Sequence, residues 1–233
     1  MGMGAIDYAL HVAPKPKLLV VTDIENARLK RAESIFTPEE AAKNGIKLVY
    51  INTKETPDAE KYLLSLTEGN GYNDVFVFAP VKAVVEMADR LLGKDGCLNF
   101  FAGPTDQKFS AEFNFYNVHY ASTHIVGTSG GNTDNMIEAL DVMGKGLVNP
   151  AVMVTHIGGL DSVAETTLNL PNIPGGKKLI YTHIKMPLIA IDDLEKLGKN
   201  SLMFAHLANI VAKNNGLWCA EAERYLLENA EAI

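Results

Sequence analysis

The amino-acid sequence predicts an α/β fold: a doubly wound parallel sheet followed by a C-terminal α/β and helical segment. Short apolar runs alternate with helical patterns from the N-terminus to about residue 130. Runs of this kind, without polar alternation, are typical of parallel strands that are buried on both faces. Helices between such strands form right-handed crossovers, which favours a mostly parallel sheet.

The first part of the chain contains the expected strands and their connecting helices. The expected strands are Leu18–Thr22, Ile46–Ile51, Val75–Phe78, Cys97–Phe101 and Ile125–Gly127. The expected helices are Gly4–Val12, Asn26–Ile35, Asp58–Leu66 and Val81–Leu92. Thr37-Pro38-Glu39-Glu40 adds a capping box with proline at the first helical position, which predicts a further short helix that ends at Asn44-Gly45.

The pattern changes after Gly130-Gly131. A helix (Thr133–Met143), a strand (Val152–Ile157), a helix (Ser162–Leu168) and a strand (Lys178–Ile184) are expected next. Three helices are expected in the tail: Ile191–Leu197, Leu202–Lys213 and Ala220–Asn229. We therefore expect three regions, residues 1–130, 131–190 and 191–233.

Composition excludes several classes of protein. The chain has 233 residues, a net charge of −7 and no cluster of basic residues, which disfavours nucleic acid as a partner. No run approaches the ~20 apolar residues of a membrane span, and no signal peptide is recognisable. The two cysteines, Cys97 and Cys219, are far apart and have no ligand at zinc-site spacing, which argues against a disulfide framework and a structural zinc site. A cytoplasmic protein without membrane contacts is expected.

Small or polar residues follow each predicted strand. Ligands of open parallel sheets bind beyond the carboxyl ends of the strands, so these residues are the candidate lining of a cofactor crevice. Alternatively, small residues at strand ends merely form tight turns. The strand ends are Asp23, Asn52-Thr53, Ala79-Pro80-Val81, Ala102-Gly103 and Gly127-Thr128-Ser129.

Asp23 directly follows the first apolar run and has two possible roles. In dinucleotide-binding folds an acidic residue at the tip of the second strand binds the adenosine ribose, about 20 residues after the phosphate-binding glycines. Gly2 precedes Asp23 by 21 residues, where the last of those glycines is expected. Alternatively, Asp23 caps the following helix, as acidic residues do at many such turns. The sequence leaves both roles open.

Several short sequence motifs, taken together, are typical of one protein family. They are Gly127–Met136 (GTSGGNTDNM), Leu147–Pro150 (LVNP), Met153–Ile157 (MVTHI) and Gly175–Tyr181 (GGKKLIY), with Phe100–Pro104 and Asn114–Tyr120. Together they resemble the C-terminal two-thirds of a zinc-type medium-chain dehydrogenase, in the branch of the sorbitol dehydrogenases and especially the sorbose-phosphate reductases. The resemblance runs from Met1 to about Leu188, and the tail with Gly216-Leu217-Trp218 is similar as well.

The resemblance implies domains, a cofactor and a set of cofactor-binding residues. Residues 1–130 would be an NAD-binding Rossmann-like domain without its first strand, residues 131–190 part of the catalytic domain, and residues 191–233 a helical tail. Asp23 would bind the ribose and favour NAD over NADP, because a carboxylate repels a 2′-phosphate. Arg28 would lie beside the adenine or phosphate, or else on a solvated helix face. The remaining candidates are Gly2 for the pyrophosphate, Pro80, Val81, Ala102 and Gly103 for the nicotinamide end, and Thr128 and Ser129 after the last strand.

Parts of the family pattern have no counterpart in this sequence. The family's zinc ligands lie in an N-terminal domain, so we expect zinc there and neither a metal site nor a catalytic residue in this chain. The first strand of the cofactor domain, normally central, is also absent. Its neighbours, the strands ending at Thr22 and Phe78, are expected to pair directly, or a subunit or extraneous segment fills the gap. The isolated histidines (His119, His124, His156, His183) are expected to be structural.

Two classes of function follow. The first is the NAD-binding part of an oxidoreductase acting on a sugar, polyol or sugar phosphate, inactive in this form. The second is a non-catalytic nucleotide-binding or oligomerisation module. A third, an unrelated doubly wound domain, is disfavoured by the Gly127–Asn135 phrase. In the family the edge strand ending near Gly127 often pairs across a dimer, so a homodimer is expected.

Overall fold

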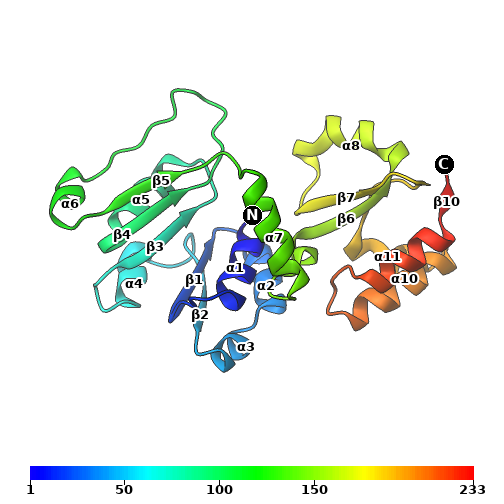
Figure 1. Ribbon diagram of the computed structural model, residues 1–233, viewed down its shortest axis with the longest axis horizontal. Helices are drawn as coiled ribbons and strands as arrows, with labels where there is room; N and C mark the ends of the chain where they lie inside the picture. Colours follow the sequence, from blue (N-terminus) through cyan, green and yellow to red (C-terminus); the bar gives the residue numbers. More distant parts are fainter. The chain divides into compact units, whose positions relative to one another are not determined.

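The computed structural model describes residues 1–233, which divide into two compact units (Figure 1). The strand-and-crossover unit contains Pro16–Gly144, together with Gly2. The C-terminal unit contains Lys145–Ile233 and the N-terminal segment Met3–Lys15, together with Met1. Each unit has its own sheets and its own apolar packing.

The strand-and-crossover unit alternates strands with helices as expected. All of its strand pairs are parallel, with β1 beside β2 and with β3, β4 and β5 in that order. The predicted α/β fold with parallel strands is therefore confirmed. The elements are β1 (Leu18–Asp23), α2 (Asn26–Ile35), α3 (Pro38–Lys43), β2 (Lys47–Asn52), α4 (Ala59–Ser65), β3 (Tyr72–Val77), α5 (Lys82–Arg90), β4 (Leu92–Phe100), α6 (Phe115–Tyr120), β5 (His124–Gly127) and α7 (Thr133–Gly144).

The two strands expected to pair directly do not do so. β1 and β3 are edge strands of separate sheets, so the alternative of direct pairing is wrong, while the alternative of a segment that fills the gap is not tested. Side chains rather than backbone hydrogen bonds connect the two sheets. Ile51, Leu63 and Leu91 are buried together, and Val20 of β1 and Val75 of β3 both pack against them. Apolar burial is non-directional, so it holds the sheets in one unit without a shared ladder.

Helix α3 begins and ends where its sequence signals predict. The Thr37 side chain accepts a hydrogen bond from the backbone N–H of Glu40 at 3.1 Å, and Pro38 occupies the first turn, where no N–H donor is needed. Gly45, with φ of +76°, then reverses the chain towards β2. This local chemistry sets the start of β2, and with it the register of Leu18 opposite Lys47.

Helix α5 covers one face of the three-stranded sheet. Val85 and Ala88 of α5 pack against Val77 of β3 and against Leu98 of β4, which is completely buried. Side chains on this helix face recur every three to four residues, as expected for an amphipathic crossover helix. The packing places the residue pairs at the carboxyl ends of β3 and β4 beside each other.

The C-terminal unit is built around a small mixed sheet and the tail helices. β6 lies between β7, which is parallel to it, and β9, which is antiparallel. The three predicted tail helices are present. The elements are α1 (Gly2–His11), η1 (Pro150–Met153), β6 (Val154–Gly159), η2 (Leu160–Ser162), α8 (Val163–Asn169), η3 (Leu170–Asn172), β7 (Lys177–Tyr181), β8 (Ile184–Lys185), β9 (Ile189–Ala190), η4 (Ile191–Asp193), α9 (Leu194–Gly198), α10 (Leu202–Lys213), α11 (Ala220–Asn229) and β10 (Glu231–Ala232).

The buried carboxylate of Asp7 attaches α1 to the rest of the C-terminal unit. Asp7 is only 2% exposed, accepts the backbone N–H of Asn149 at 2.6 Å and lies 2.9 Å from His11 Nδ1. A buried carboxylate needs such partners, because an unsatisfied one is strongly destabilising. The contact connects residues that are 142 positions apart in the sequence.

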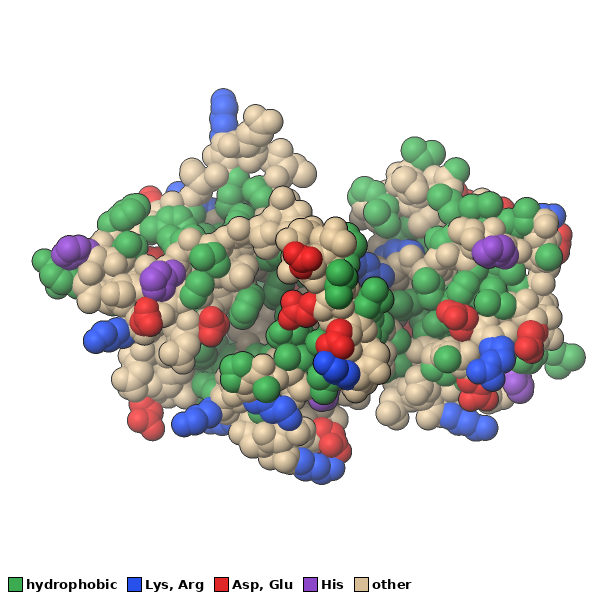
Figure 2. All heavy atoms as spheres, viewed as in Figure 1, with side chains coloured by type: hydrophobic (Ala, Val, Ile, Leu, Met, Phe, Trp, Pro, Cys, Tyr) green, Lys and Arg blue, Asp and Glu red, His purple; other side chains and the backbone are tan.

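The surface carries mixed charge. On the face drawn in Figure 2, acidic and basic side chains are interspersed with apolar ones, and the basic ones stand singly or in small groups. No helix is both long and apolar enough to cross a membrane.

Candidate functional site

Asp23 closes β1 and makes local contacts with both carboxylate oxygens. Its Oδ1 accepts the backbone N–H groups of Ile24 and Glu25, at 2.8 and 2.9 Å. Its Oδ2 lies 3.6 Å from the Arg28 guanidinium. The carboxylate thus organises the turn that leads into α2. The alternative that it caps the helix is wrong, because Glu25 occupies the N-cap position and no side chain caps α2. Oδ2 has no backbone donor and is the oxygen through which Asp23 could bind a ligand.

Arg28 lies one turn into α2 and is mostly solvated. Its side chain is 73% exposed, and its contact with Asp23 is a surface ion pair. Exposed pairs of this kind contribute about 0–1 kcal/mol, so the contact does little for stability. Arg28 therefore lies on a solvated face of α2, and its expected role beside the adenine or phosphate stays a prediction.

Beside Asp23 lies a hydrogen-bonded ring of three residues that the sequence did not predict: Asn26, Asn52 and Glu55. Asn52 Nδ2 donates to Asn26 Oδ1 at 2.7 Å, and Asn26 Nδ2 donates to Glu55 Oε1 at 2.7 Å. The Glu55 N–H returns to Asn52 Oδ1 at 3.2 Å. The position of Asn52 at a strand end was noticed from the sequence, but its partners become visible only once β1 and β2 pair, with Asp23 opposite Asn52.

The second group of candidates lies at the carboxyl ends of β3, β4 and β5. Val77, Phe100 and Gly127 are in register across these strands, so the residues that follow them lie at one edge of the sheet. This edge holds Pro80, Val81, Ala102, Gly103, Thr128 and Ser129, and their role as the lining of a cofactor crevice stays a prediction.

The residues at this edge differ in what they could offer a ligand. Val81 is 50% exposed, whereas Ala102 is buried. No atom lies within 4 Å of the place where a Cβ of Gly103 would stand, so the backbone there is open to a ligand. The Thr128 hydroxyl is used locally and donates to the Gly130 carbonyl at 2.6 Å. The edge is mainly apolar and suits a flat ring with few hydrogen-bonding groups.

Gly2 is the first residue of α1. No atom lies within 4 Å of the position that a Cβ would take there. Its expected role at a pyrophosphate stays a prediction.

The structure offers no arrangement of residues that fits zinc. No group of three or more histidine, cysteine, aspartate or glutamate side chains lies close enough to hold a metal ion. His156 is buried in β6 beside the Thr155 hydroxyl, and burial together with the nearby Lys178 charge lowers its pKa. Burial also raises the pKa of the Cys97 thiol, which makes it a poor nucleophile.

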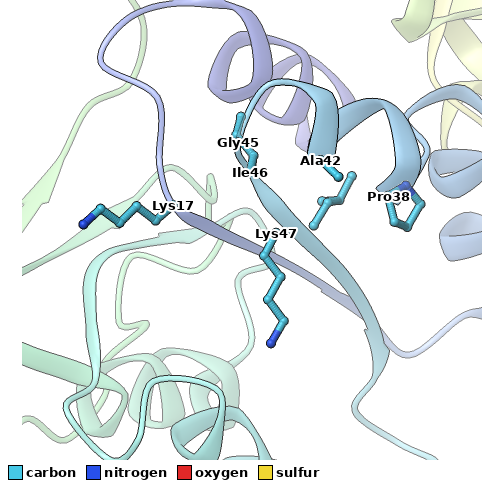
Figure 3. Close-up of a pocket in the computed structure, with 7 residues that line it drawn as sticks. Lys17, Pro38, Ala42, Gly45, Ile46 and Lys47 are labelled. Atoms are coloured by element: carbon cyan, nitrogen blue, oxygen red, sulfur yellow. The ribbon is translucent and has the colours of Figure 1, made fainter.

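A shallow pocket of about 360 Å³ lies away from all these residues (Figure 3). It occupies the amino-terminal ends of β1 and β2, the opposite end of these strands from Asp23. The Lys17 and Lys47 side chains at its rim point in different directions rather than converging on a common point. The pocket is lined by Lys17, Pro38, Ala42, Gly45, Ile46, Lys47 and Leu48. Without convergent polar groups it does not compete with the strand ends as a binding site.

Comparisons with known proteins bear on this geometry. A family model described as zinc-binding dehydrogenase matches residues 1–145. Mannitol-1-phosphate 5-dehydrogenase of Aliivibrio fischeri is 55% identical over 228 residues, which cover 98% of this chain and 54% of that protein. L-sorbose 1-phosphate reductase of Klebsiella pneumoniae is 46% identical over 233 residues, which cover 100% of this chain and 53% of that protein.

Solved structures show the same fold at lower identity. One is an alcohol dehydrogenase from Escherichia coli CFT073, crystallised in complex with NADH. It matches with a TM-score of 0.57 and 17% sequence identity, over 77% of this chain and 48% of that one. At this identity the match concerns the fold alone.

Proposed function

We propose, on the premise that this chain belongs to the zinc-binding dehydrogenases, that it binds NAD at the carboxyl ends of its parallel strands and serves a polyol or sugar-phosphate oxidoreductase. The resemblance predicted from the sequence phrases is confirmed, and one relative is a sorbose-phosphate reductase. The chain spans about half the length of the curated relatives it matches. The activity of the whole enzyme, its substrate class and the three expected regions are therefore part of the proposal.

The observation that carries the proposal is the position of Asp23 at the tip of β1. One carboxylate oxygen is used by the turn, and the other, Oδ2, has no backbone donor. A ribose hydroxyl is a suitable donor for that oxygen. The open, apolar edge at Val81 and Gly103 suits the nicotinamide ring, which supplies or accepts the hydride when the cofactor is bound. These two groups of residues thus fit the two ends of a dinucleotide.

Asp23 and Arg28 have opposite effects on the choice of cofactor. The carboxylate favours an unmodified ribose, because it repels the 2′-phosphate of NADP, whereas the guanidinium attracts that phosphate. Arg28 is strongly exposed and 3.6 Å from Asp23, so its charge is screened by solvent. We therefore propose that NAD binds more tightly than NADP.

A strand from outside residues 1–233 would complete the site. β1 and β3 present unpaired edges within one unit, and their side chains share an apolar cluster. An inserted parallel strand would pair with the backbone groups of both edges and cover their partly exposed side chains, which would stabilise the unit. We propose that the remaining part of a longer polypeptide, or another subunit, supplies it.

Titration calorimetry with NAD and with NADP tests the proposal. We expect saturable binding of NAD, weaker binding of NADP, and about tenfold weaker NAD binding by Asp23→Ala, the loss of one charge-assisted hydrogen bond. Asp106→Ala is the matched control, because the Asp106 carboxylate also accepts a backbone N–H in its own turn but lies outside the candidate site. Absence of binding by either nucleotide, or equal binding by the Asp23 and Asp106 variants, would contradict the proposal.

Oligomerisation is the second candidate function, and an exposed strand at the edge of a sheet favours it. β5 is an edge strand, and Ile125 and Val126 on it are 43% and 46% exposed. The strand has neither proline nor lysine, the residues that commonly protect a sheet edge. We propose that this edge forms a homodimer, and light scattering coupled to size exclusion measures it. A monomeric mass at micromolar concentration would exclude a stable dimer.

A further inference from the structure

We propose that Asn52 is a positioning residue for Asp23, and that it acts through the turn Asp23–Asn26. This inference rests on the proposed nucleotide function and adds a residue that sets the strength of its ribose contact. Asn52 ends β2 and lies opposite Asp23 in the parallel pair. The backbone N–H of Thr53 also donates to the Asp23 carbonyl at 3.1 Å, so the two strand ends are joined at this point.

The side-chain amide of Asn52 uses its full hydrogen-bonding capacity. Nδ2 donates to the Ile24 carbonyl at 3.2 Å and to Asn26 Oδ1 at 2.7 Å. Oδ1 accepts the backbone N–H groups of Lys54 and Glu55, at 3.0 and 3.2 Å. An amide offers two donors and two acceptor positions, and no other side chain of this length combines them. Aspartate would lack both donors.

These bonds hold the turn at atoms that the Asp23 carboxylate does not contact. Asp23 Oδ1 binds the N–H groups of Ile24 and Glu25, while Asn52 binds the Ile24 carbonyl and the Asn26 side chain. The turn is thus held at several atoms by two residues that end adjacent strands. With Oδ1 committed to the turn, the direction of Oδ2 depends on the position of the turn. Asn52 therefore controls where the ligand-facing oxygen of Asp23 lies.

Glu55 connects Asn52 to Asn26 a second time, through the hydrogen-bonded ring. Glu55 Oε1 accepts from Asn26 Nδ2, and the Glu55 N–H donates to Asn52. All three bonds of the ring are solvent-accessible, and exposed groups of this kind contribute little to global stability. Their effect is local, on the geometry of the first turn of α2.

A double-mutant cycle on NAD affinity separates positioning from a general structural role. We expect Asn52→Ala to weaken NAD binding about tenfold in the unaltered chain, and to have no further effect in the Asp23→Ala background. Asn70→Ala is the matched control: the Asn70 amide also makes a local bond, to the Thr67 carbonyl, but lies far along the chain from Asp23. Equal losses from Asn52→Ala with and without Asp23 would overturn the proposal.

Amide hydrogen exchange in the absence of nucleotide gives an independent readout. Asn52→Ala should accelerate exchange of the Ile24 and Glu25 amides, which Asn52 does not contact, as well as those of Lys54 and Glu55, which it does. Unchanged exchange at Ile24 and Glu25 would overturn the positioning role. If the unaltered chain fails to bind NAD while these amides respond, the proposed function fails and the positioning role of Asn52 stands.

Discussion

Replacing Tyr181 with phenylalanine tests the contact that attaches the tail to the sheet of the C-terminal unit. Trp218 Nε1 donates to the Tyr181 hydroxyl at 2.7 Å, and the hydroxyl donates to Glu223 Oε2 at 2.7 Å. Burial and the Glu223 carboxylate raise the pKa of Tyr181, so its hydroxyl remains a donor throughout the neutral range. The chain of bonds joins β7, the segment before α11, and α11 itself.

The magnitude of the loss follows from the burial of Trp218. Trp218 is 4% exposed within the main apolar cluster of the unit, while Tyr181 and Glu223 are partly buried, so water replaces the lost acceptor poorly. An unsatisfied buried donor costs about 1–3 kcal/mol, and the Glu223 carboxylate loses its own donor as well. We therefore expect Tyr181→Phe to lower the free energy of unfolding of this unit by about 2 kcal/mol, the middle of that range.

The assay is urea unfolding followed by tryptophan fluorescence. Trp218 is the sole tryptophan of the chain, so the signal reports on the C-terminal unit alone. Tyr225→Phe is the matched control: Tyr225 is also a partly buried tyrosine of this unit, and its ring packs against His206. A destabilisation by Tyr181→Phe no larger than that of Tyr225→Phe would refute the argument from the buried donor.

Three further predictions concern pH and capping. Burial raises the pKa of Tyr72 to about 12, so its contribution to stability is present below pH 10 and is lost between pH 10 and 12; Tyr72→Phe should flatten that alkaline limb in thermal melts. Burial lowers the pKa of His156, so the folded state binds fewer protons than the unfolded state below pH 6.5. His156 should therefore lower the free energy of unfolding on acidification by at most about 1.4 kcal/mol per pH unit. His156→Gln should reduce the dependence of stability on pH in this range. Thr37→Ala removes the cap on α3 and should cost about 1 kcal/mol in urea unfolding followed by circular dichroism, whereas an unchanged midpoint would contradict the capping role.

Local sequence chemistry predicted most of the elements with small errors at their ends. The apolar run before Asp23 is β1, and the signals at Thr37 and Gly45 bound α3 as expected. The strand expected at Cys97–Phe101 begins earlier, at Leu92, because the chain already pairs with Tyr72 there. Helix α6 (Phe115–Tyr120) was not predicted, although Asn114 caps it with a side-chain oxygen. A helix of six residues is too short for helical periodicity to be recognised in the sequence.

The candidate site was predictable as a set of strand ends but not as a set of contacts. The acidic residue after β1 and the small residues after β3 and β4 follow from the order of the chain, because parallel strands end at the same edge of their sheet. The cofactor-binding roles expected for all the candidate residues, the preference for NAD, the homodimer and the cytoplasmic location stay predictions. Each depends on a ligand, a partner or a compartment rather than on the order of elements.

The sequence alone was sufficient for the α/β class, the family resemblance and the place of Asp23 at a strand tip, because apolar runs, caps and turn residues act over a few neighbouring positions. The pairing of distant residues came only from the folded chain. Asn52 meets Asn26 after β1 and β2 align, and Tyr181 meets Trp218 after the tail packs on β7. The separation of β1 from β3 was also visible only in the folded chain. An edge strand exposes unpaired backbone groups that any suitable strand can pair with, so its own sequence does not determine its partner.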